Sequence, residues 1–198
     1  MNKLKKNQMN SKNILVLAVL LISGLLSVNG VFAETAGPTT SITEANVNLN
    51  IVLQPIQTIT VNPTQADVNI VYHNIDNYEK GVSVTKEKHL EVFSTGGFTV
   101  SVKSDGDFKR AGGGAIAAGD VLVSATNGQG TLPAVTLAIS EGSGSNIISS
   151  TKGGRKLNYD VTYNNTTATV DRYIDKYIAA DGEKSVYTAT VTYTIAAQ

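Results

Sequence analysis

The chain has 198 residues, in which 16 Lys and Arg balance 16 Asp and Glu, and it contains no cysteine. The lack of cysteine excludes disulfides and cysteine-ligated metals. Four of the basic residues lie in the first 33 positions, so residues 34–198 carry 12 basic and 16 acidic side chains. This mild acidity argues against nucleic acid or anionic lipid as a partner, because both bind clustered Lys and Arg.

The first 33 residues have the three parts of a secretory signal peptide. An apolar run at 14–26 leads to the small residue Ala33, and the run follows the basic residues Lys3, Lys5, Lys6 and Lys12. The run is shorter than the roughly 20 residues that span a membrane, and a retained N-terminal anchor is the alternative. We therefore predict an exported protein with a signal peptide at 1–33, a flexible linker at 34–44 and no membrane span after cleavage.

The rest of the chain, 45–198, consists of short candidate strands separated by turn residues. Each candidate is rich in Val, Ile, Thr or Tyr and is bounded by Gly, Asn, Asp or Pro, as antiparallel strands usually are. The predicted strands are 46–53, 56–61, 67–72, 90–94, 98–103, 121–125, 134–139, 146–150, 156–163 and 185–196. This pattern predicts a single all-β domain with little helix, an immunoglobulin-like antiparallel β-sandwich.

The clearest local signal is a hairpin within 89–104. Apolar and polar residues alternate on both sides of Gly96-Gly97, with Leu90 and Val92 before the turn and Phe98, Val100 and Val102 after it. Two glycines can supply the positive φ of a two-residue hairpin turn. We therefore predict that the two arms pair with each other and bury one face.

Helix signals are weak. Residues 74–89 have room for one helical turn before Gly81. In 170–180, Tyr173 and Tyr177 stand at i,i+4, which suits a short helix, while a strand is equally compatible with the same residues. The glycine-rich stretch 109–119 predicts a loop at an edge or tip of the sandwich.

Residues that could carry chemistry are scattered. His73 and His89 are the two histidines of the chain, fewer than the three or four ligands of a zinc site. No serine stands in a nucleophile elbow, and the glycine-rich stretches lack the phosphate-loop ending. We predict a non-catalytic protein without cofactor or metal; Tyr163, Tyr173 and Tyr177 are the aromatic candidates for contact with a sugar, with a structural role as the alternative.

Both ends of the predicted domain alternate strictly between apolar and polar residues. A long one-faced strand with an unpaired edge invites pairing with another chain. The candidate strand-pairing residues are Val47, Leu49, Ile51 and Leu53 at the start and Tyr187, Val191, Tyr193 and Ile195 at the end. The first set could equally belong to an ordinary first strand, because Pro55 leads almost directly into 56–61.

The tail "GEKSVYTATVTYTIAAQ" resembles the C-terminal signature of chaperone–usher fimbrial subunits, with Gly182 followed by alternating residues that include Tyr187, Val191 and Tyr193. The stretches "FSTGGFTVSVKS" and "TYTIAAQ" also resemble small uncharacterised secreted β-sandwich proteins of Gram-negative bacteria. The fimbrial resemblance implies a sandwich that lacks its last strand and accepts a neighbour's N-terminal segment by β-strand addition.

Two functions follow as expectations. The first is an exported structural or adhesive surface protein, a fimbria-like subunit that pairs with copies of itself or with a periplasmic chaperone. The second is a monomeric secreted binding module for a carbohydrate or a protein. The expected location is the periplasm, the cell surface or the extracellular medium.

Overall fold

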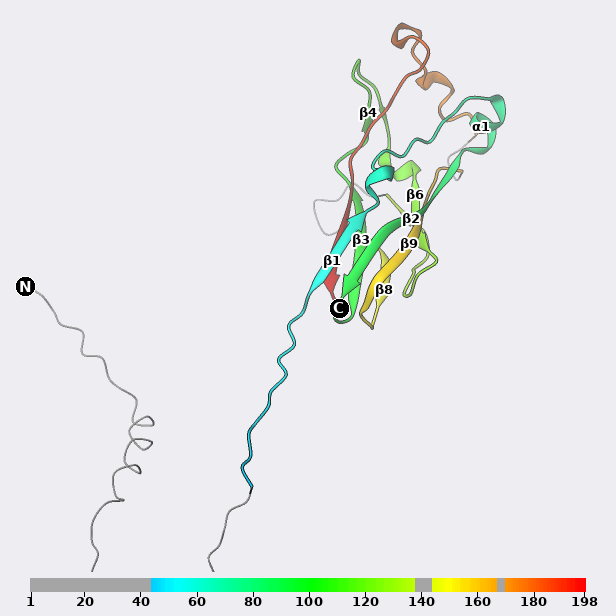
Figure 1. The fold of residues 1–198 in the computed structure, drawn as a ribbon. Coiled ribbons are helices and arrows are strands. Elements are labelled where there is room, and N and C mark those ends of the chain that lie inside the picture. Colours follow the sequence, from blue (N-terminus) through cyan, green and yellow to red (C-terminus); the bar gives the residue numbers. More distant parts are fainter. Residues whose placement is uncertain (1–43, 138–143, 167–169) are drawn as a thin grey trace, which may run out of the picture. The chain divides into compact units, whose positions relative to one another are not determined.

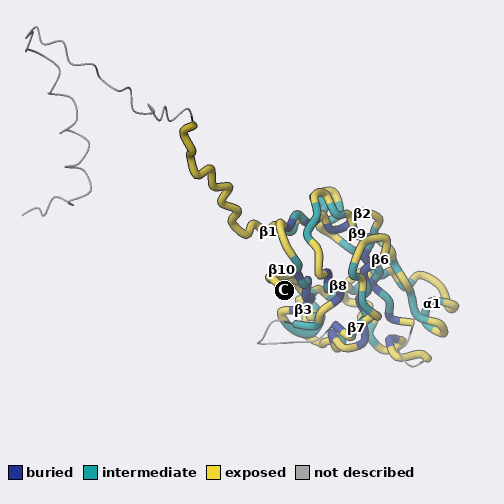
Figure 2. The backbone as a smooth tube through the Cα atoms, turned by 90° about the horizontal axis from the view of Figure 1, so that it is seen from below, coloured by how far each residue is buried: buried dark blue, intermediate teal, exposed yellow. Residues whose placement is uncertain are grey.

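The computed structural model describes residues 44–137, 144–166 and 170–198. The chain divides into two units, 1–50 and 51–198, and each is described by itself. The predicted signal peptide and the predicted linker up to residue 43 lie outside the described residues. From Glu44 to Asn50, the described part of the first unit has no helix or strand, and all its residues are exposed (Figure 2).

The second unit is built from antiparallel strands, so the prediction of an all-β fold is confirmed (Figure 1). The strands are β1 (Gln57–Val61), β2 (Ser83–Ser94), β3 (Phe98–Ser104), β4 (Phe108–Lys109), β5 (Ala115–Ile116), β6 (Leu122–Thr126), β7 (Val135–Thr136), β8 (Ser145–Ser150), β9 (Gly154–Asn164) and β10 (Val191–Ala197). One sheet has the order β1-β2-β9-β6-β7, a second has the order β10-β3-β8, and β4 pairs with β5.

The two larger sheets share one hydrophobic core, as in a sandwich. Alternate residues of β3 and β9 point into it, so Phe98 and Val100 from one sheet meet Tyr159 and Val161 from the other, all fully buried. The period-two alternation of the sequence thus corresponds to burial on one face of each strand. The immunoglobulin-like topology stays a prediction.

The predicted hairpin at 89–104 is wrong in its pairing. The arm before the turn lies in β2, which pairs with β1 and β9, whereas the arm after the turn is β3, which pairs with β10 and β8. Neither Gly96 nor Gly97 has a positive φ. Each arm has one apolar face. Because the arms lie in opposite sheets, the two faces meet across the core and cover each other, which two neighbouring strands of one sheet cannot do.

Two other predicted strands are absent. Residues 46–53 and 67–72 have no regular secondary structure. Val68 and Ile70 do alternate and pack against the core, but a strand also requires a backbone partner, which sequence alternation does not supply. The strand predicted at 185–196 begins only at Val191.

The described helices are short. The helix α1 (Ile75–Lys80) begins where the Asn74 side chain accepts a hydrogen bond from Asn77 N and ends at Gly81, as predicted. The 3₁₀ turns are η2 (Pro63–Gln65), η3 (Ala118–Asp120), η4 (Ile174–Lys176) and η5 (Ala179–Asp181). Of the two structures predicted for 170–180, the strand is absent and the short helix is present only as 3₁₀ turns. None of the helices in the described part of the chain is long and apolar enough to cross a membrane.

Candidate functional site

Two strand edges lie next to each other at one side of the sandwich. β1 is a terminal strand of the five-stranded sheet and β10 is a terminal strand of the three-stranded sheet, so each has one hydrogen-bonded neighbour among the described strands. The two strands run side by side in Figure 1, where β1 is cyan and β10 is red, and some of their Cα atoms lie within 8 Å of each other. We call this pair of edges the β1/β10 edge.

The β10 side of this edge presents free backbone groups of alternate residues. Thr190 O accepts a hydrogen bond from Asp105 N (3.0 Å), and Gln198 N donates one to Gly97 O (3.1 Å). Since residues of an antiparallel pair alternate in exchanging hydrogen bonds, the even-numbered residues of β10 bond to β3. The backbone N–H and C=O groups of Val191, Tyr193 and Ile195 therefore point to the open side.

The β1 side has the same arrangement. Thr95 N donates to Ile56 O (3.0 Å) and Asn62 N donates to His89 O (2.8 Å), which assigns the even-numbered residues to the pairing with β2. The backbone groups of Gln57, Ile59 and Val61 point away from β2. Unpaired strand edges of this kind are templates for another strand.

The side chains at these odd positions are only half-buried. Ile59 and Val61 from β1 and Val191, Tyr193 and Ile195 from β10 pack against the core without being covered, while the even positions between them are exposed. The hydrophobic core therefore reaches the surface between β1 and β10.

The β1/β10 edge is narrower than an inserted strand requires. Neighbouring strands lie about 4.8 Å apart, so two strands that flank a third are separated by about 9.6 Å. Because some Cα atoms of β1 and β10 lie within 8 Å of each other, an incoming strand must move these edges apart by at least about 2 Å at those positions.

A buried polar chain ties β10 to the opposite sheet at this edge. The hydroxyl oxygens of Tyr163 and Tyr193 lie 2.5 Å apart, His89 Nε2 lies 2.9 Å from Tyr163 Oη, and His89 Nδ1 lies 3.0 Å from Gln65 Oε1. Neutral His89 with its proton on Nδ1 satisfies this order: Tyr193 donates to Tyr163, Tyr163 donates to His89, and His89 donates to Gln65. Burial, with a smaller contribution from Lys86, lowers the pKa of His89.

The N-terminal candidates are exposed. The exposed fractions are 89% for Val47, 87% for Leu49, 84% for Ile51 and 87% for Leu53. Side chains of this size are normally buried. Residues 46–53 therefore do not form the predicted strand, and their apolar side chains are exposed to solvent.

Three of the four C-terminal candidates come together on β10, and the fourth does not. Val191, Tyr193 and Ile195 share the face described above. Tyr187 precedes the strand, and its hydroxyl donates to Lys176 O (2.7 Å), so it fastens the segment that contains η4. Tyr187 therefore belongs to a different contact from the strand edge.

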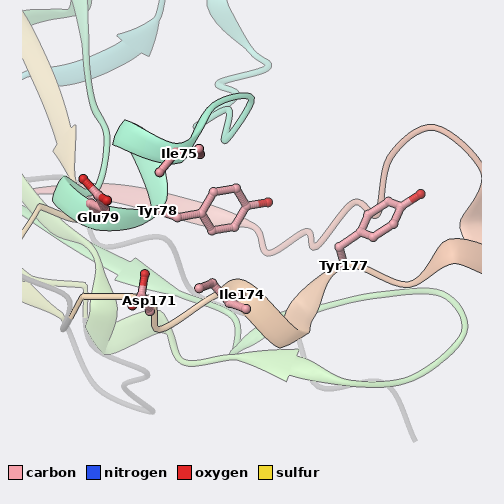
Figure 3. A pocket seen from close by; sticks show the side chains of 6 residues that line it. All are labelled: Ile75, Tyr78, Glu79, Asp171, Ile174 and Tyr177. Carbon is pink, nitrogen blue, oxygen red and sulfur yellow. The ribbon is translucent and has the colours of Figure 1, made fainter.

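A second site lies beside α1. Ile75, Tyr78 and Glu79 from α1 face Asp171, Ile174 and Tyr177 around an open pocket of about 400 Å³. Figure 3 shows the Tyr78 ring between the two isoleucines, with both carboxylates at one end and Tyr177 at the other. We call it the apex pocket, and we call the end of the unit formed by α1 and residues 170–182 the apex (Figure 1).

The apex pocket rests on an aromatic stack in which Tyr173 is buried and Tyr72 and Tyr78 are half-buried. The Tyr78 ring contacts Tyr72 at 5.1 Å between centroids, and Tyr72 contacts Tyr173 edge-on at 5.3 Å. Tyr173 Oη donates to Asp120 Oδ2 (3.0 Å), and Arg172 Nη1 lies 2.8 Å from Asp120 Oδ1. Burial and the neighbouring Asp120 carboxylate raise the pKa of Tyr173, so the hydroxyl keeps its proton and this anchor persists at neutral pH.

The structure changes the list of candidate sugar contacts. Tyr163 and Tyr173 are buried with their hydroxyls bonded internally, and only Tyr177 is substantially exposed, at 49%. The prediction missed Ile75, Tyr78 and Glu79. Their i,i+3,i+4 spacing behind the capping residue Asn74 is a signal for one helix face, and it could have identified them.

No family model matches this sequence, and no curated protein matches it significantly.

Proposed function

We propose that this protein is an exported, non-catalytic structural or adhesive surface subunit that assembles by β-strand addition. Residues 45–53 of one copy occupy the β1/β10 edge of another copy. The observation that carries the proposal is that two complementary features occur in one chain. The core is uncovered between two unpaired edges, and an exposed segment has apolar residues at alternate positions. The fimbrial resemblance of the tail agrees with this mechanism.

The period of the donor matches that of the acceptor. Val47, Leu49, Ile51 and Leu53 repeat every second residue, as do the half-buried positions of β1 and β10. An added strand gains main-chain hydrogen bonds from the edge and places alternate side chains in the core. The asparagines between the donor residues would then face the solvent.

The segment is poorly suited to filling its own edge. Ile56 is held at the turn between β2 and β3, because Ile56 N donates to Thr95 Oγ1 (2.9 Å) and Thr95 N donates to Ile56 O (3.0 Å). A fold-back onto β1 would have to reverse at Gln54-Pro55. The two-residue hairpin turns favour Asn-Gly or a leading Gly with positive φ, and proline φ stays near −65°. Donation to a second copy avoids this reversal.

The test replaces apolar donor residues by charged ones. In Leu49→Asp/Ile51→Asp, a carboxylate would have to enter an apolar core, so chains or filaments should disappear while the folded domain remains. The matched control, Asn48→Asp/Asn50→Asp, adds the same charge on the other face and should assemble nearly as well. Electron microscopy and sedimentation velocity report assembly, and circular dichroism reports folding.

Two results would contradict the proposal. Assembly of the Leu49→Asp/Ile51→Asp variant at the level of the native protein would exclude this segment as the donor. Loss of folding on deletion of 45–53 would show that the segment is part of its own domain. The location at the cell surface is tested separately by fractionation of the producing cells.

A further inference from the structure

The apex pocket combines features that suit a basic partner. Two tyrosines and two isoleucines form an apolar surface, and Ile75 and Ile174 are 77% and 54% exposed. Exposed apolar patches on soluble domains usually mark interaction sites. Glu79 and Asp171 add two negative charges at one end of this surface (Figure 3).

Neighbouring cations do not neutralise these carboxylates. Lys80 pairs with Asp76 at 2.7 Å, and Arg172 pairs with Asp120 at 2.8 Å. Lys176 stands on η4 beside the acidic residue Asp175, so the turn itself adds no net charge. Among the described residues, neither Glu79 nor Asp171 takes part in an ion pair.

The backbone of Asp171 is fixed beside α1. Asp171 has a φ of 63°, and its N–H donates to Tyr78 O (3.1 Å) at the end of α1. Together with the aromatic stack below Tyr78, this contact makes the pocket a preformed surface. Preformed surfaces lose little conformational entropy when a partner binds.

The opposite end of the same unit is basic. The turn between β8 and β9 lies against the turn between β2 and β3, since a Cβ on Gly153 would meet Ser94 O at 2.3 Å. We call these two turns the base. Exposed Lys152, Arg155 and Lys156 are located in or next to this turn, and none has an ion pair within the described ranges.

Strand addition brings a base and an apex together. The donor segment leaves its own unit at the base, next to Thr95. β10 also ends at the base, where Gln198 bonds to Gly97. β1 and β10 run in opposite directions, so a donor between them is antiparallel to one of them and parallel to the other whichever way it runs. A donor antiparallel to β10 runs from base to apex of the acceptor. The donor's own base then meets the acceptor's apex; the opposite direction would bring two basic ends together.

We propose that the apex pocket is the docking surface for the basic β8–β9 turn of a second copy, with Arg155 as its main contact. A guanidinium can stack on a tyrosine ring and pair with a carboxylate at once. This inference rests on the proposed function and adds a second contact between neighbouring subunits.

Cross-linking tests the contact directly, because the chain has no native cysteine. Purified Lys152→Cys protein, which keeps Arg155, is mixed with Ile174→Cys protein under mild oxidation, and a disulfide forms when the two Cα atoms come within about 7 Å. The control replaces Lys152→Cys by Glu87→Cys, an exposed position on β2. We expect at least about tenfold more disulfide-linked heterodimer than in the control mixture, because docking raises the effective concentration of one cysteine near the other.

Charge reversal provides the second arm. Arg155→Glu should weaken association about tenfold or more, because like charges then meet at the pocket. Mixing Arg155→Glu protein with Glu79→Lys protein should restore the association.

The outcomes separate the two proposals. If cross-linking stays at the level of the control while the protein still forms chains, this inference is overturned and the strand proposal stays intact. Strong cross-linking in Leu49→Asp/Ile51→Asp protein that forms no chains would support the pocket contact and leave the strand proposal intact. Cysteine variants with the native donor segment that give neither cross-links nor chains would overturn both.

Discussion

Tyr193 of β10 and Tyr163 of β9 join the two sheets through hydroxyl oxygens 2.5 Å apart. The pair stands directly beneath the uncovered β1/β10 edge, at the point where an added strand would enter. Its hydrogen bond therefore links the stability of the domain to the position of the edge strand.

Removal of the Tyr193 hydroxyl tests this link. Tyr193→Phe should lower the free energy of unfolding by about 1 kcal/mol, the usual net value of a hydrogen bond. Combined with Tyr163→Phe in a double-mutant cycle, urea denaturation should give a coupling energy of similar size. Strict additivity of the two single changes would show that the hydroxyls do not interact in solution.

Acidification should destabilise the fold through His89. Burial lowers its pKa in the folded state below the value of 6.5 found without the protein environment. The unfolded state therefore binds the proton more readily, so this stability is present above about pH 6.5 and is lost as the pH falls toward the lower folded pKa. Urea denaturation at about pH 7.5 and about pH 5.5 should show this decrease.

Two variants test whether His89 causes this loss of stability at low pH. His89→Gln should flatten the dependence on pH over this window, although it lowers the stability itself. His73→Gln changes an exposed histidine and should leave the dependence unchanged. An unchanged slope in His89→Gln would assign the effect to other groups.

Asp120 should control the order of the apex. Its carboxylate accepts hydrogen bonds from Tyr173 and Arg172, and a hydrogen bond that involves a charged group contributes about 1.5–3 kcal/mol. Asp120→Asn should therefore speed hydrogen exchange and proteolysis within 170–182. Asp175→Asn removes an exposed charge nearby and serves as the control; equal exchange in both variants would contradict this role of Asp120.

The reversal at Gln54-Pro55 should control the partner choice of the donor segment. Gln54→Asn/Pro55→Gly provides the Asn-Gly pair that favours a two-residue hairpin turn. The segment can then fold back onto its own β1, and the balance should shift from chains to monomers in sedimentation velocity. Gln54→Asn alone keeps the proline and should behave like the native protein. Unaltered chain length in the double variant would show that Pro55 does not prevent self-pairing.

The strand positions could be predicted because alternation is a local property. β3, β8 and β9 lie within a few residues of their expected limits, and the Asn74 cap and Gly81 limit α1 as the residue types indicate. The odd positions of β10 were also identified as a group. Each of these features depends on neighbours two to four residues apart along the chain.

The partners of those strands could not be predicted in the same way. β2 pairs with β9, about 70 residues later, and with β1, so the two arms around Gly96-Gly97 separate into opposite sheets. The alternation of Leu90 and Val92 is the same whether the face meets a hairpin partner or a second sheet. Tertiary burial decides between these pairings, because it covers both apolar faces at once.

The sequence by itself determined where apolar and polar residues alternate, and most of these stretches form one-faced strands, since side-chain direction has a period of two along a strand. Tertiary structure alone decided that β1 and β10 end up as adjacent open edges and that α1 meets residues 171–177 in a pocket. These arrangements depend on contacts between segments that are far apart in the chain, and no local pattern encodes the distance between them.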